Sequence, residues 1–351
     1  MESDYDMKVL MIGPARNVNG GISAVVNNYY KAELDKKIEL KYIGTMEDGS
    51  KLHKLSVAVG AIFKFVWNVY HYDIVHINMA SDMSLYRKIP FIYLTKLFGK
   101  KLVIHQHGGS FKEFYYQECN EKKQKFIKKT LEKADVFLVV ADYLGEIFKH
   151  IITPDKVMSL PNAIEVSEIV GEKTYGQKLL FLGRLCKEKG IRELLETVIE
   201  LKEEFRDLEL YLGGVWIDED LKDVADKHTE FIHQLGWIEK EEKEKYLQKC
   251  NIFVLPTYFE GLPMSLLEGM SYECACIASA VGGIPQVIED GDDGILILPK
   301  DKDGLKEAIR NLIQDNSIQK KMGTAARQKV IEQFELKKSI NRLVNIYSTL
   351  V

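Results

Sequence analysis

Short apolar runs rich in β-branched residues alternate with longer amphipathic segments along the whole chain. In the first half these runs lie at residues 8–12, 39–43, 74–77, 102–105, 136–140 and 157–160. After Pro161-Asn162 the pattern restarts, with runs at residues 178–182, 208–212, 231–233, 252–255, 275–278 and 295–298. Apolar strands separated by helical segments are typical of βα units around a parallel sheet. The pattern therefore predicts an α/β protein with two such sheets.

The segment between the two halves, residues 163–177, is polar, carries Gly171 and Gly176 and has no clear periodicity. It is the predicted linker. From Asp301 onward three helical segments follow one another, and no strand precedes the last of them, residues 336–351. A chain of 351 residues also exceeds what one hydrophobic core usually carries, which again predicts two domains.

The composition is 46% hydrophobic, 28% charged and 10% aromatic, as in a globular enzyme that folds throughout. Five dispersed cysteines without a Cys-x-x-Cys motif favour a reducing, cytoplasmic compartment. The first six residues are acidic where a signal peptide would be basic, so we expect no secretion. Lys64 interrupts the most apolar stretch, residues 55–72, so no transmembrane helix is predicted.

Charge is unevenly distributed between the two halves. Residues 1–165 contain 23 Lys+Arg and 19 Asp+Glu, whereas the remainder contains 25 and 33. The basic excess concentrates between Arg87 and Lys133, with 12 basic and 4 acidic residues. This asymmetry indicates an anionic partner for the first half, and a solvated helix face is the alternative. We expect an anionic membrane surface rather than a nucleic acid, bound by the basic helical segment 122–129, which includes Lys122, Lys125 and Lys129, together with Lys96, Lys100 and Lys101. Phe126, Thr130 and Leu131 are expected to pack inward.

The loop after the first predicted strand does not match one class of enzyme, the dinucleotide-dependent oxidoreductases. It runs from Gly13 to Gly21 without a G-x-G-x-x-G spacing, and the second strand ends without the acidic ribose ligand of that class. Gly20-Gly21 instead precedes a predicted helix, where bare backbone amides can approach an anion. A tight turn is the alternative role for this pair.

Two further loops carry charged residues at the ends of strands. The strand at 178–182 is followed by Arg184 and Lys189, which together could neutralise a diphosphate. The strand at 252–255 is followed by Glu260-Gly261-Leu262-Pro263, with Pro263 in the first turn of a helix that contains Glu268. Carboxylates accept hydrogen bonds from vicinal hydroxyls, so the two acids suit different parts of one extended ligand.

Together these motifs resemble a known family, the retaining family 4 (group 1) glycosyltransferases. The resemblance lies in Gly183-Arg184-Leu185 with Lys189-Gly190, in Glu260 and Glu268 within the Glu-Gly-Leu-Pro segment, and in Val281-Gly282-Gly283-Ile284-Pro285. It extends to Gly20-Gly21, His105-Gln106-His107-Gly108 and Leu160-Pro161-Asn162-Ala163. The sequence departs from the family pattern at Ala163, Cys274 and Gln286.

The resemblance implies a GT-B fold, with two Rossmann-like domains facing across a cleft. Residues 1–165 would bind the acceptor, residues 166–335 the nucleotide sugar, and the helix at 336–351 would cross back to the first domain. Arg184 and Lys189 would hold the donor diphosphate, Glu268 the ribose and Glu260 the transferred sugar. Gly20 and Gly21 would approach the diphosphate from the other domain, and His107 would line the sugar pocket.

We therefore expect a metal-independent retaining glycosyltransferase that moves a hexose or N-acetylhexosamine, with UDP as the favoured carrier. The expected acceptor is a glycan or a lipid-linked glycan in surface polysaccharide biosynthesis. The enzyme would need no cofactor, because the nucleotide sugar is a substrate. A metal site at His105 and His107 lacks an evident third ligand, since Asp218-Glu219-Asp220 lies in the other domain and marks a helix start. The alternatives are a sugar-nucleotide epimerase or hydrolase, and a non-catalytic nucleotide-sugar-binding subunit.

Overall fold

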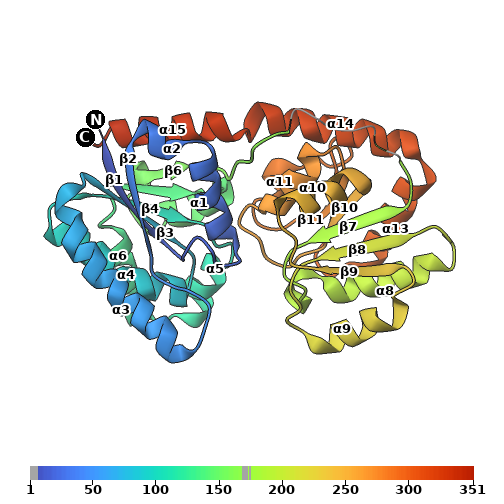
Figure 1. The fold of residues 1–351 in the computed structure, drawn as a ribbon, viewed down its shortest axis with the longest axis horizontal. Coiled ribbons are helices and arrows are strands. Elements are labelled where there is room, and N and C mark those ends of the chain that lie inside the picture. The colour runs from blue at the N-terminus through green and yellow to red at the C-terminus, as the bar shows by residue number, and fades with distance from the viewer. Residues whose placement is uncertain (1–6, 168–172, 174) are drawn as a thin grey trace. The chain divides into compact units, whose positions relative to one another are not determined.

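A computed structural model describes residues 7–167, 173 and 175–351 of the chain (Figure 1). Residues 1–6, which include the acidic N-terminal stretch, lie outside the described residues, as do residues 168–172 and 174 of the predicted linker. The chain divides into two compact units. Unit 1 comprises residues 1–165 and 336–351, and unit 2 comprises residues 166–335.

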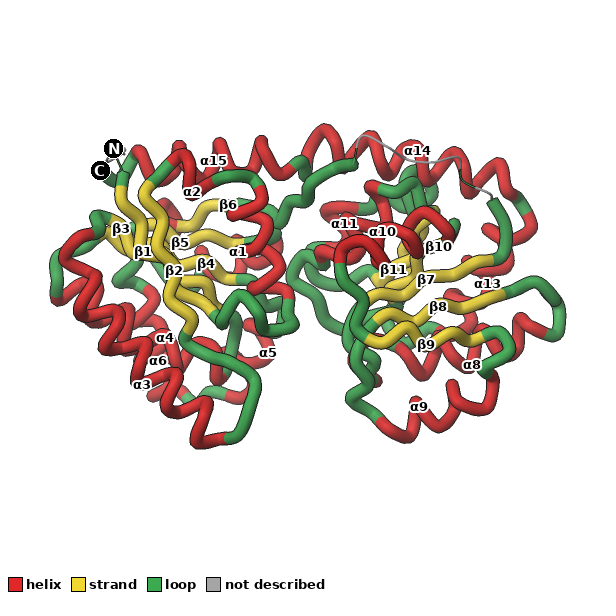
Figure 2. The backbone as a smooth tube through the Cα atoms, in the orientation of Figure 1, coloured by secondary structure: helices red, strands yellow, loops and turns green. Residues whose placement is uncertain are grey.

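All twelve predicted strands are present, and only their ends differ from the prediction. Unit 1 contains β1 (Lys8–Gly13), β2 (Glu39–Gly44), β3 (Ile74–Met79), β4 (Lys101–Gln106), β5 (Val136–Val139) and β6 (Val157–Ser159). Unit 2 contains β7 (Lys178–Leu182), β8 (Glu209–Gly213), β9 (Ile232–Gly236), β10 (Ile252–Leu255), β11 (Ala275–Ser279) and β12 (Ile295–Ile297). Their apolar side chains form the two cores, because helices cover both faces of each sheet (Figure 2).

The sheet of unit 1 is parallel, with strand order β2-β1-β3-β4-β5-β6. One face carries α1 (Gly21–Lys31), α2 (Leu34–Lys37) and α15 (Leu336–Ser348). The other carries α3 (Lys51–Asn68), α4 (Met83–Leu97) and α6 (Glu121–Leu131). The short α5 (Phe111–Glu113) and α7 (Asp142–Lys149) complete the unit. The strand order reverses between β1 and β3, and ligands bind at such switch points in open α/β sheets.

The sheet of unit 2 is also parallel, with order β12-β11-β10-β7-β8-β9. Its helices are α8 (Ile191–Lys202), α9 (Glu219–Ala225), α10 (Lys240–Lys249), α11 (Met264–Ser271), α12 (Ile284–Val287), α13 (Lys302–Gln314) and α14 (Asn316–Gln333). Counted within the unit, this is the strand order of a dinucleotide-binding Rossmann fold. Its switch point lies between β7 and β10.

Helix α15 ends the chain but packs in unit 1, as predicted for a helix that returns to the first domain. Its buried residues recur every three or four positions: Leu336, Ile340, Leu343, Ile346 and Tyr347. Nζ of Lys37 donates to Oδ1 of Asn341 over 2.7 Å, and the Tyr347 hydroxyl lies 2.5 Å from Nδ1 of His76 on β3. An apolar stripe and two polar contacts therefore hold α15 to the first unit.

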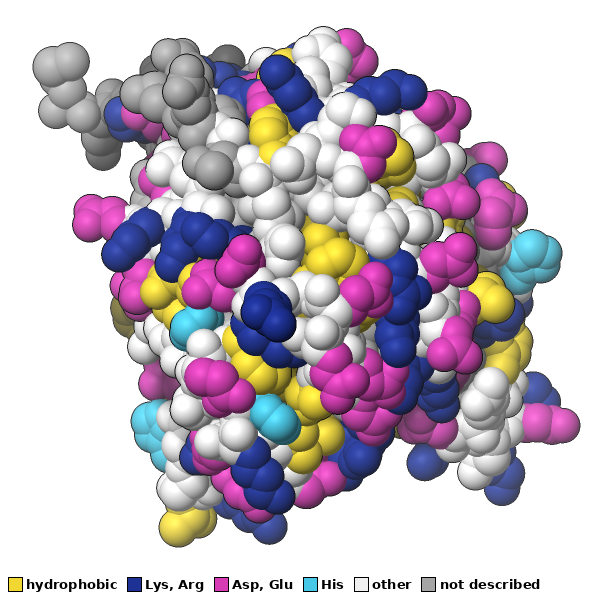
Figure 3. Space-filling model, turned by 90° about the vertical axis from the view of Figure 1, so that its right-hand side faces the viewer, with side chains coloured by type: hydrophobic (Ala, Val, Ile, Leu, Met, Phe, Trp, Pro, Cys, Tyr) yellow, Lys and Arg dark blue, Asp and Glu magenta, His cyan; other side chains and the backbone are white. Residues whose placement is uncertain are grey.

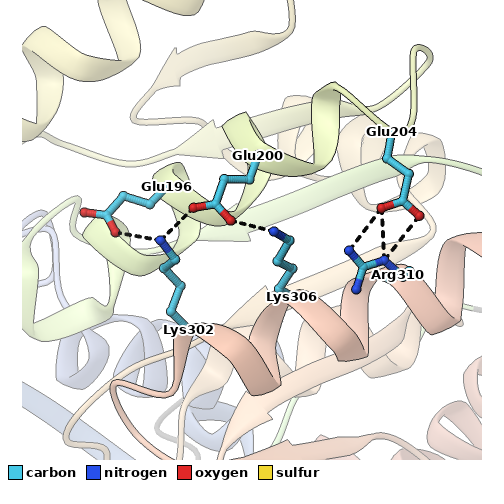
Figure 4. Close-up of polar contacts among 6 residues, drawn as sticks. All are labelled: Glu196, Glu200, Glu204, Lys302, Lys306 and Arg310. Carbon is cyan, nitrogen blue, oxygen red and sulfur yellow. Dashed lines mark hydrogen bonds and ion pairs between the residues drawn. The ribbon is translucent and has the colours of Figure 1, made fainter.

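A row of ion pairs joins α8 to α13 on the surface of unit 2 (Figure 4). The acids follow one another at four-residue intervals along α8, and the bases do the same along α13, so each helix presents one charged edge. The pairs are Lys302 with Glu196 and Glu200, Lys306 with Glu200, and Arg310 with Glu204. The two lysines lower the pKa of Glu200 to about 2.

On the side of the molecule seen in Figure 3, basic and acidic side chains are interspersed rather than gathered by sign. Screening of mixed surface charges makes single pairs there worth little. Among the described residues, none of the helices combines the length and the hydropathy that a bilayer span requires.

Candidate functional site

The loop after β7 carries Arg184 and Lys189 at the carboxyl end of a central strand. Arg184 is exposed, and Lys189 ends a short 3-10 turn that leads directly into α8. Gly190 connects the two helical turns with φ 70°, a left-handed conformation that favours glycine. The sequence therefore presents both cations where parallel-sheet proteins bind their ligands.

The loops after β7 and β10 contact each other at the switch point. A Cβ on Gly190 would lie 2.0 Å from the carbonyl oxygen of Pro256, so only a glycine lets the two backbones approach this closely. The backbone N–H of Tyr258 donates to the carbonyl of Glu188 over 2.8 Å. The Tyr258 hydroxyl reaches Glu193 on α8 at 2.6 Å, and burial and this contact raise its pKa. These contacts lock the two loops together.

Lys189 and Glu260 form an ion pair across these two loops, from Nζ to Oε1. Their side chains are 17% and 14% exposed, so both are largely withdrawn from water. Sequence reasoning assigned Lys189 to the diphosphate and Glu260 to the sugar. The structure brings the two together, so each can orient the other.

The segment after Glu260 leads into α11. Gly261 and Leu262 are buried, and Pro263 is the residue before the first helical turn, one position earlier than predicted. The carbonyl of Gly261 accepts from the backbone N–H of Gly283 over 2.8 Å, which joins the Glu-Gly-Leu-Pro segment to the Gly-Gly-Ile-Pro segment. The N-terminus of α11 therefore lies at the same edge of the sheet, where its free amides favour an anion.

Glu268 lies inside α11, as the sequence predicted. Its Oε1 accepts from Nζ of Lys243 on α10 over 2.5 Å. Sequence reasoning missed Lys243, because it lies in a segment of alternating Lys and Glu that resembles a solvated helix surface. The two acids thus have separate basic partners, Lys189 for Glu260 and Lys243 for Glu268.

In unit 1 the glycine pair lies at the start of α1. Gly20 precedes the helix without a side-chain cap, and Gly21 is its first residue. A Cβ added at either glycine would meet nothing within 4 Å, so these amides border open space. In the same loop Nε of Arg16 donates to Oδ1 of Asn27 over 2.9 Å, and Cζ of Arg16 lies 3.7 Å from the centre of the Tyr30 ring. The loop therefore carries one cation, Arg16, and the helix that follows it begins without a side-chain cap.

His107 follows β4 at the same edge of the unit 1 sheet. Its Nε2 lies 2.9 Å from Oδ1 of Asn78 on β3, and Asn78 in turn donates to the carbonyl of Ile12 on β1. Asn78 therefore connects His107 to the strand that carries the glycine loop. Burial lowers the pKa of His107 to about 3, so the imidazole is neutral near pH 7.

Three imidazoles stand side by side behind this position. The ring centres of His107 and His105 are 4.1 Å apart, and those of His105 and His76 are 5.5 Å apart. Burial, together with the neighbouring imidazoles, lowers the pKa of His105 well below its usual value and that of His76 to about 3. The row extends from the site to Tyr347 on α15, so it connects the last helix to the candidate site.

A buried lysine lies beneath the glycine loop, and sequence reasoning did not single it out. Lys88 on α4 is 1% exposed, and its Nζ donates to Oγ1 of Thr45. The Thr45 hydroxyl donates to the carbonyl of Gly13 at the end of β1 over 2.9 Å. Burial lowers the pKa of Lys88 to about 7, because the charged form loses its hydration.

The basic helix α6 differs from the prediction in one residue. Thr130 and Leu131 are buried as expected, but Phe126 is 45% exposed, so the prediction that it packs inward was wrong. Ile127 is buried instead, because it falls on the face that α6 turns toward the sheet. Lys122, Lys125 and Lys129 are exposed.

Metal ligands do not cluster in the part of the chain that the structure describes: it holds no group of three His, Cys, Asp or Glu side chains arranged to bind an ion. All five cysteines are buried as free thiols, including Cys274 and Cys276, which the sequence placed in the core. Asp218 precedes α9, as predicted for a helix start.

The fold defines a class, the α/β proteins with two Rossmann-like units, each with a switch point in its parallel sheet. Residues 176–315 match the family model described as Glycosyl transferases group 1. An uncharacterized glycosyltransferase of Methanocaldococcus jannaschii is 26% identical over 309 residues, covering 82% of this chain and 79% of that protein. Residues 176–315, in unit 2, thus match the group 1 glycosyltransferase family, in agreement with the group 1 resemblance of the motifs they contain.

Solved structures resemble the whole chain. Sucrose-phosphate synthase from Thermosynechococcus elongatus has a TM-score of 0.80 at 18% identity, covering 97% of this chain and 98% of that one. The Anabaena protein HepE, in complex with UDP, has a TM-score of 0.76 at 14% identity, covering 98% and 100%. These likenesses confirm the GT-B fold class. The binding roles of the two domains, and the meeting of their site residues across a cleft, stay predictions.

Proposed function

We propose that this glycosyltransferase is a metal-independent retaining enzyme that transfers a hexose or N-acetylhexosamine from a nucleoside diphosphate sugar. The observation that carries the proposal is the convergence of Arg184, Lys189, Glu260 and the N-terminus of α11 at the switch point of unit 2. Cations, helix amides and carboxylates are what a diphosphate joined to two hydroxyl-bearing sugars requires.

The proposed chemistry depends on charge that develops in the leaving group. As the bond between sugar and diphosphate breaks, the diphosphate gains negative charge, and fixed donors around it lower the barrier. Arg184, Lys189 and the α11 amides would supply this stabilisation in place of a metal ion. Glu260, held by Lys189, would orient the transferred sugar, and Glu268 would bind the ribose. Gly261, Leu262 and Pro263 would shape the backbone around the donor.

Unit 1 would contribute the acceptor side. The amides of Gly20 and Gly21 border open space and would approach the diphosphate. His107 would line the sugar pocket as a neutral imidazole, offering hydrogen bonds without adding positive charge. We assign no carboxylate nucleophile, because Glu260 and Glu268 are each paired with a lysine.

UDP is the favoured carrier, which the UDP bound to the structurally similar HepE supports. The proposed acceptor is a glycan or a lipid-linked glycan in surface polysaccharide biosynthesis. The protein would act on the cytoplasmic face of the plasma membrane as a peripheral protein, with the exposed lysines of α6 attracted to anionic lipid.

The test is a panel of nucleotide sugars offered to the full chain, followed by product analysis on the glycan lipids of its own organism, with and without EDTA. We expect one donor to be consumed only when acceptor is present, with retained anomeric configuration and with full activity in EDTA. Loss of transfer on chelation, restored by magnesium or manganese, would contradict metal independence.

The same panel separates the alternatives. Consumption or isomerisation of the donor without acceptor would identify a hydrolase or an epimerase. Tight donor binding without turnover on any glycan would identify a non-catalytic binding subunit. An inverted product would leave the family and fold intact but overturn the retaining mechanism.

A further inference from the structure

Helix α3 has its apolar side chains on the surface rather than in the core. Of its eighteen residues, Ala61 and Phe65 alone are buried. Seven large apolar side chains on α3 and the turn after it are exposed: Leu52 80%, Leu55 61%, Val59 45%, Phe63 73%, Val66 37%, Trp67 83% and Tyr70 64%. Single exposed apolar residues are common, but this many on one helix are not.

These seven residues form one continuous stripe, which we name the α3 stripe. Apart from the adjacent Val66 and Trp67, they recur every three or four positions, so at about 100° per residue all seven fall within roughly a third of the helix circumference. Ala61 and Phe65 lie on the opposite side, where Phe65 packs against Phe91 of α4 with ring centres 5.3 Å apart. The stripe therefore points directly away from unit 1, at whose outer surface α3 lies beside α4 (Figure 1).

The surroundings of the stripe are basic. Residues 51–72 contain no Asp or Glu. Lys51 and Lys64 flank the stripe, Lys54 lies toward the side of Ala61 and Phe65, and all three are exposed. At its C-terminal end Lys41 binds Oδ1 of Asn68 over 2.6 Å, and Lys100 binds the carbonyl of Tyr70 over 3.1 Å.

Neighbouring residues complete the edges of the surface. Leu97, which is 76% exposed, adds an apolar side chain beside Phe98, whose ring centre lies 4.7 Å from that of Tyr70. At the N-terminal end Glu47 contacts His53 over 3.2 Å, and Asp48 beside it is exposed. The surface is thus an apolar band whose border carries more lysines than acids, and the acids, Glu47, Asp48 and Asp73, lie at its two ends.

We propose that the α3 stripe inserts into the interface of an anionic bilayer, with α3 lying in the plane of the membrane. Leu, Phe, Trp and Tyr side chains on one face with lysines along the edges are what an interfacial helix requires, since the rings occupy the headgroup level and the ammonium groups meet lipid phosphates. A soluble acidic partner would match the lysines but not a band of seven outward apolar side chains.

This inference extends the membrane association in the proposed function and gives it a second, different element. Helix α4 packs against both α3 and α6, so the lysines of α6 and the α3 stripe belong to the same helical layer. Long-range attraction by lysines weakens with salt, whereas burial of apolar side chains does not. The α6 lysines would bring the protein to the membrane, and the α3 stripe would anchor it.

The experiment is flotation of the full chain with vesicles, without donor or acceptor. The vesicles are phosphatidylserine mixed with phosphatidylcholine, or phosphatidylcholine alone, each at low and at high salt. The test variant combines Leu55→Ser, Phe63→Ser and Trp67→Ser. The control combines Leu298→Ser and Ile318→Ser, which are exposed apolar residues of unit 2 at 68% and 39%. A second test variant carries Lys122→Glu, Lys125→Glu and Lys129→Glu.

We expect wild type and control to bind anionic vesicles and to keep part of that binding at high salt. The α3 variant should lose at least about tenfold in vesicle affinity and retain only salt-sensitive binding. The α6 variant should bind more weakly at low salt but keep the salt-resistant part. In a Trp216→Phe, Trp237→Phe background, Trp67 fluorescence should shift to shorter wavelength on vesicle addition.

Three results would overturn the inference. These are a wild-type chain that ignores anionic vesicles at low salt, an α3 variant that binds them as wild type does, and a Trp67 emission that does not change. A dimer that dissociates in the α3 variant, seen by sedimentation, would identify a second copy as the occupant. Calorimetry measures UDP binding by each variant, and the proposed UDP site lies in unit 2. A variant that loses vesicle binding but keeps UDP binding therefore separates membrane docking from the proposed function.

Discussion

The Lys189 ammonium and the Glu260 carboxylate form an ion pair that joins the loops after β7 and β10 at the switch point of the second sheet. Each residue alone would be a partly buried charge facing a ligand site. Paired, they hold each other in place before a substrate arrives, which is the preorganisation that a binding site for charged sugars requires.

Glu260→Gln should lower the free energy of unfolding by about 2 kcal/mol, because it leaves the Lys189 cation withdrawn from water without its counter-charge. Lys189→Met should have a similar effect, and the double variant should cost clearly less than the sum. Urea unfolding of the four proteins gives this coupling. Additive effects would contradict a stabilising pair.

Glu268→Gln should weaken UDP binding by about 1.5 to 3 kcal/mol, the value of a hydrogen bond to a charged group, if Glu268 binds the ribose. Glu260→Gln should weaken UDP binding less than Glu268→Gln does, since it acts on the diphosphate only through Lys189, and it should reduce transfer, because its own partner is the transferred sugar. Calorimetry with UDP measures both, and Lys243→Met controls for loss of the ion pair to Glu268. Equal losses of affinity in the two glutamate variants would refute the division of roles.

Gly190→Ala should destabilise unit 2 by more than about 3 kcal/mol, because left-handed strain of about 1 to 2 kcal/mol adds to the overlap with the Pro256 carbonyl. Gly236→Ala is the matched control. Gly236 has φ 67°, but an added Cβ would meet nothing within 4 Å, so it should show the strain alone. Thermal unfolding of both variants separates backbone strain from overlap with the Pro256 carbonyl. Equal losses of stability in the two variants would show that this overlap has no cost.

The free energy of unfolding should fall as the pH drops from about 6.5 toward 3. His76 has its pKa lowered to about 3 by burial, so in this range the unfolded chain binds a proton that the folded chain does not. The slope is at most about 1.4 kcal/mol per pH unit for this group. His76→Asn should flatten the dependence in urea unfolding at several pH values, and an unchanged slope would show that His76 is charged when folded.

Lys88→Met should raise the free energy of unfolding at pH 7, because it removes a buried cation without a carboxylate partner. The folded pKa of about 7 lies below the unfolded value, so wild-type stability rises with pH from about 7 to about 10.4. The difference between variant and wild type should therefore shrink over that range. If the difference in unfolding free energy between variant and wild type did not change with pH, the Lys88 ammonium would be hydrated in the folded protein.

Much of the architecture could be predicted from the order of side chains alone. Short apolar runs such as those at β7 and β10, alternating with helical segments, are typical of the buried strands of a parallel sheet, and the polar segments with Gly and Pro between them lie at its edges. The motif residues Arg184, Lys189 and Glu260 follow strand ends in the sequence, so their placement at one edge of the sheet follows from the direction of parallel strands.

The spacing of glycines, acids and prolines also carried the resemblance to the group 1 glycosyltransferases, and residues 176–315 match that family model. The errors of the sequence prediction were local. Phe126 was expected to pack inward, but neighbouring positions on a helix differ by about 100°, and the core selected Ile127.

Only the tertiary structure decided which charges meet. Lys243 and Glu268 lie on different helices, and Lys189 pairs with an acid 71 positions away, because packing of the elements sets these distances. The same holds for the row from His107 to Tyr347, which joins two strands to the last helix. Whether an apolar helix face is covered depends on what packs against it, so the apolar residues of α3 were visible in the sequence, but their outward stripe was not.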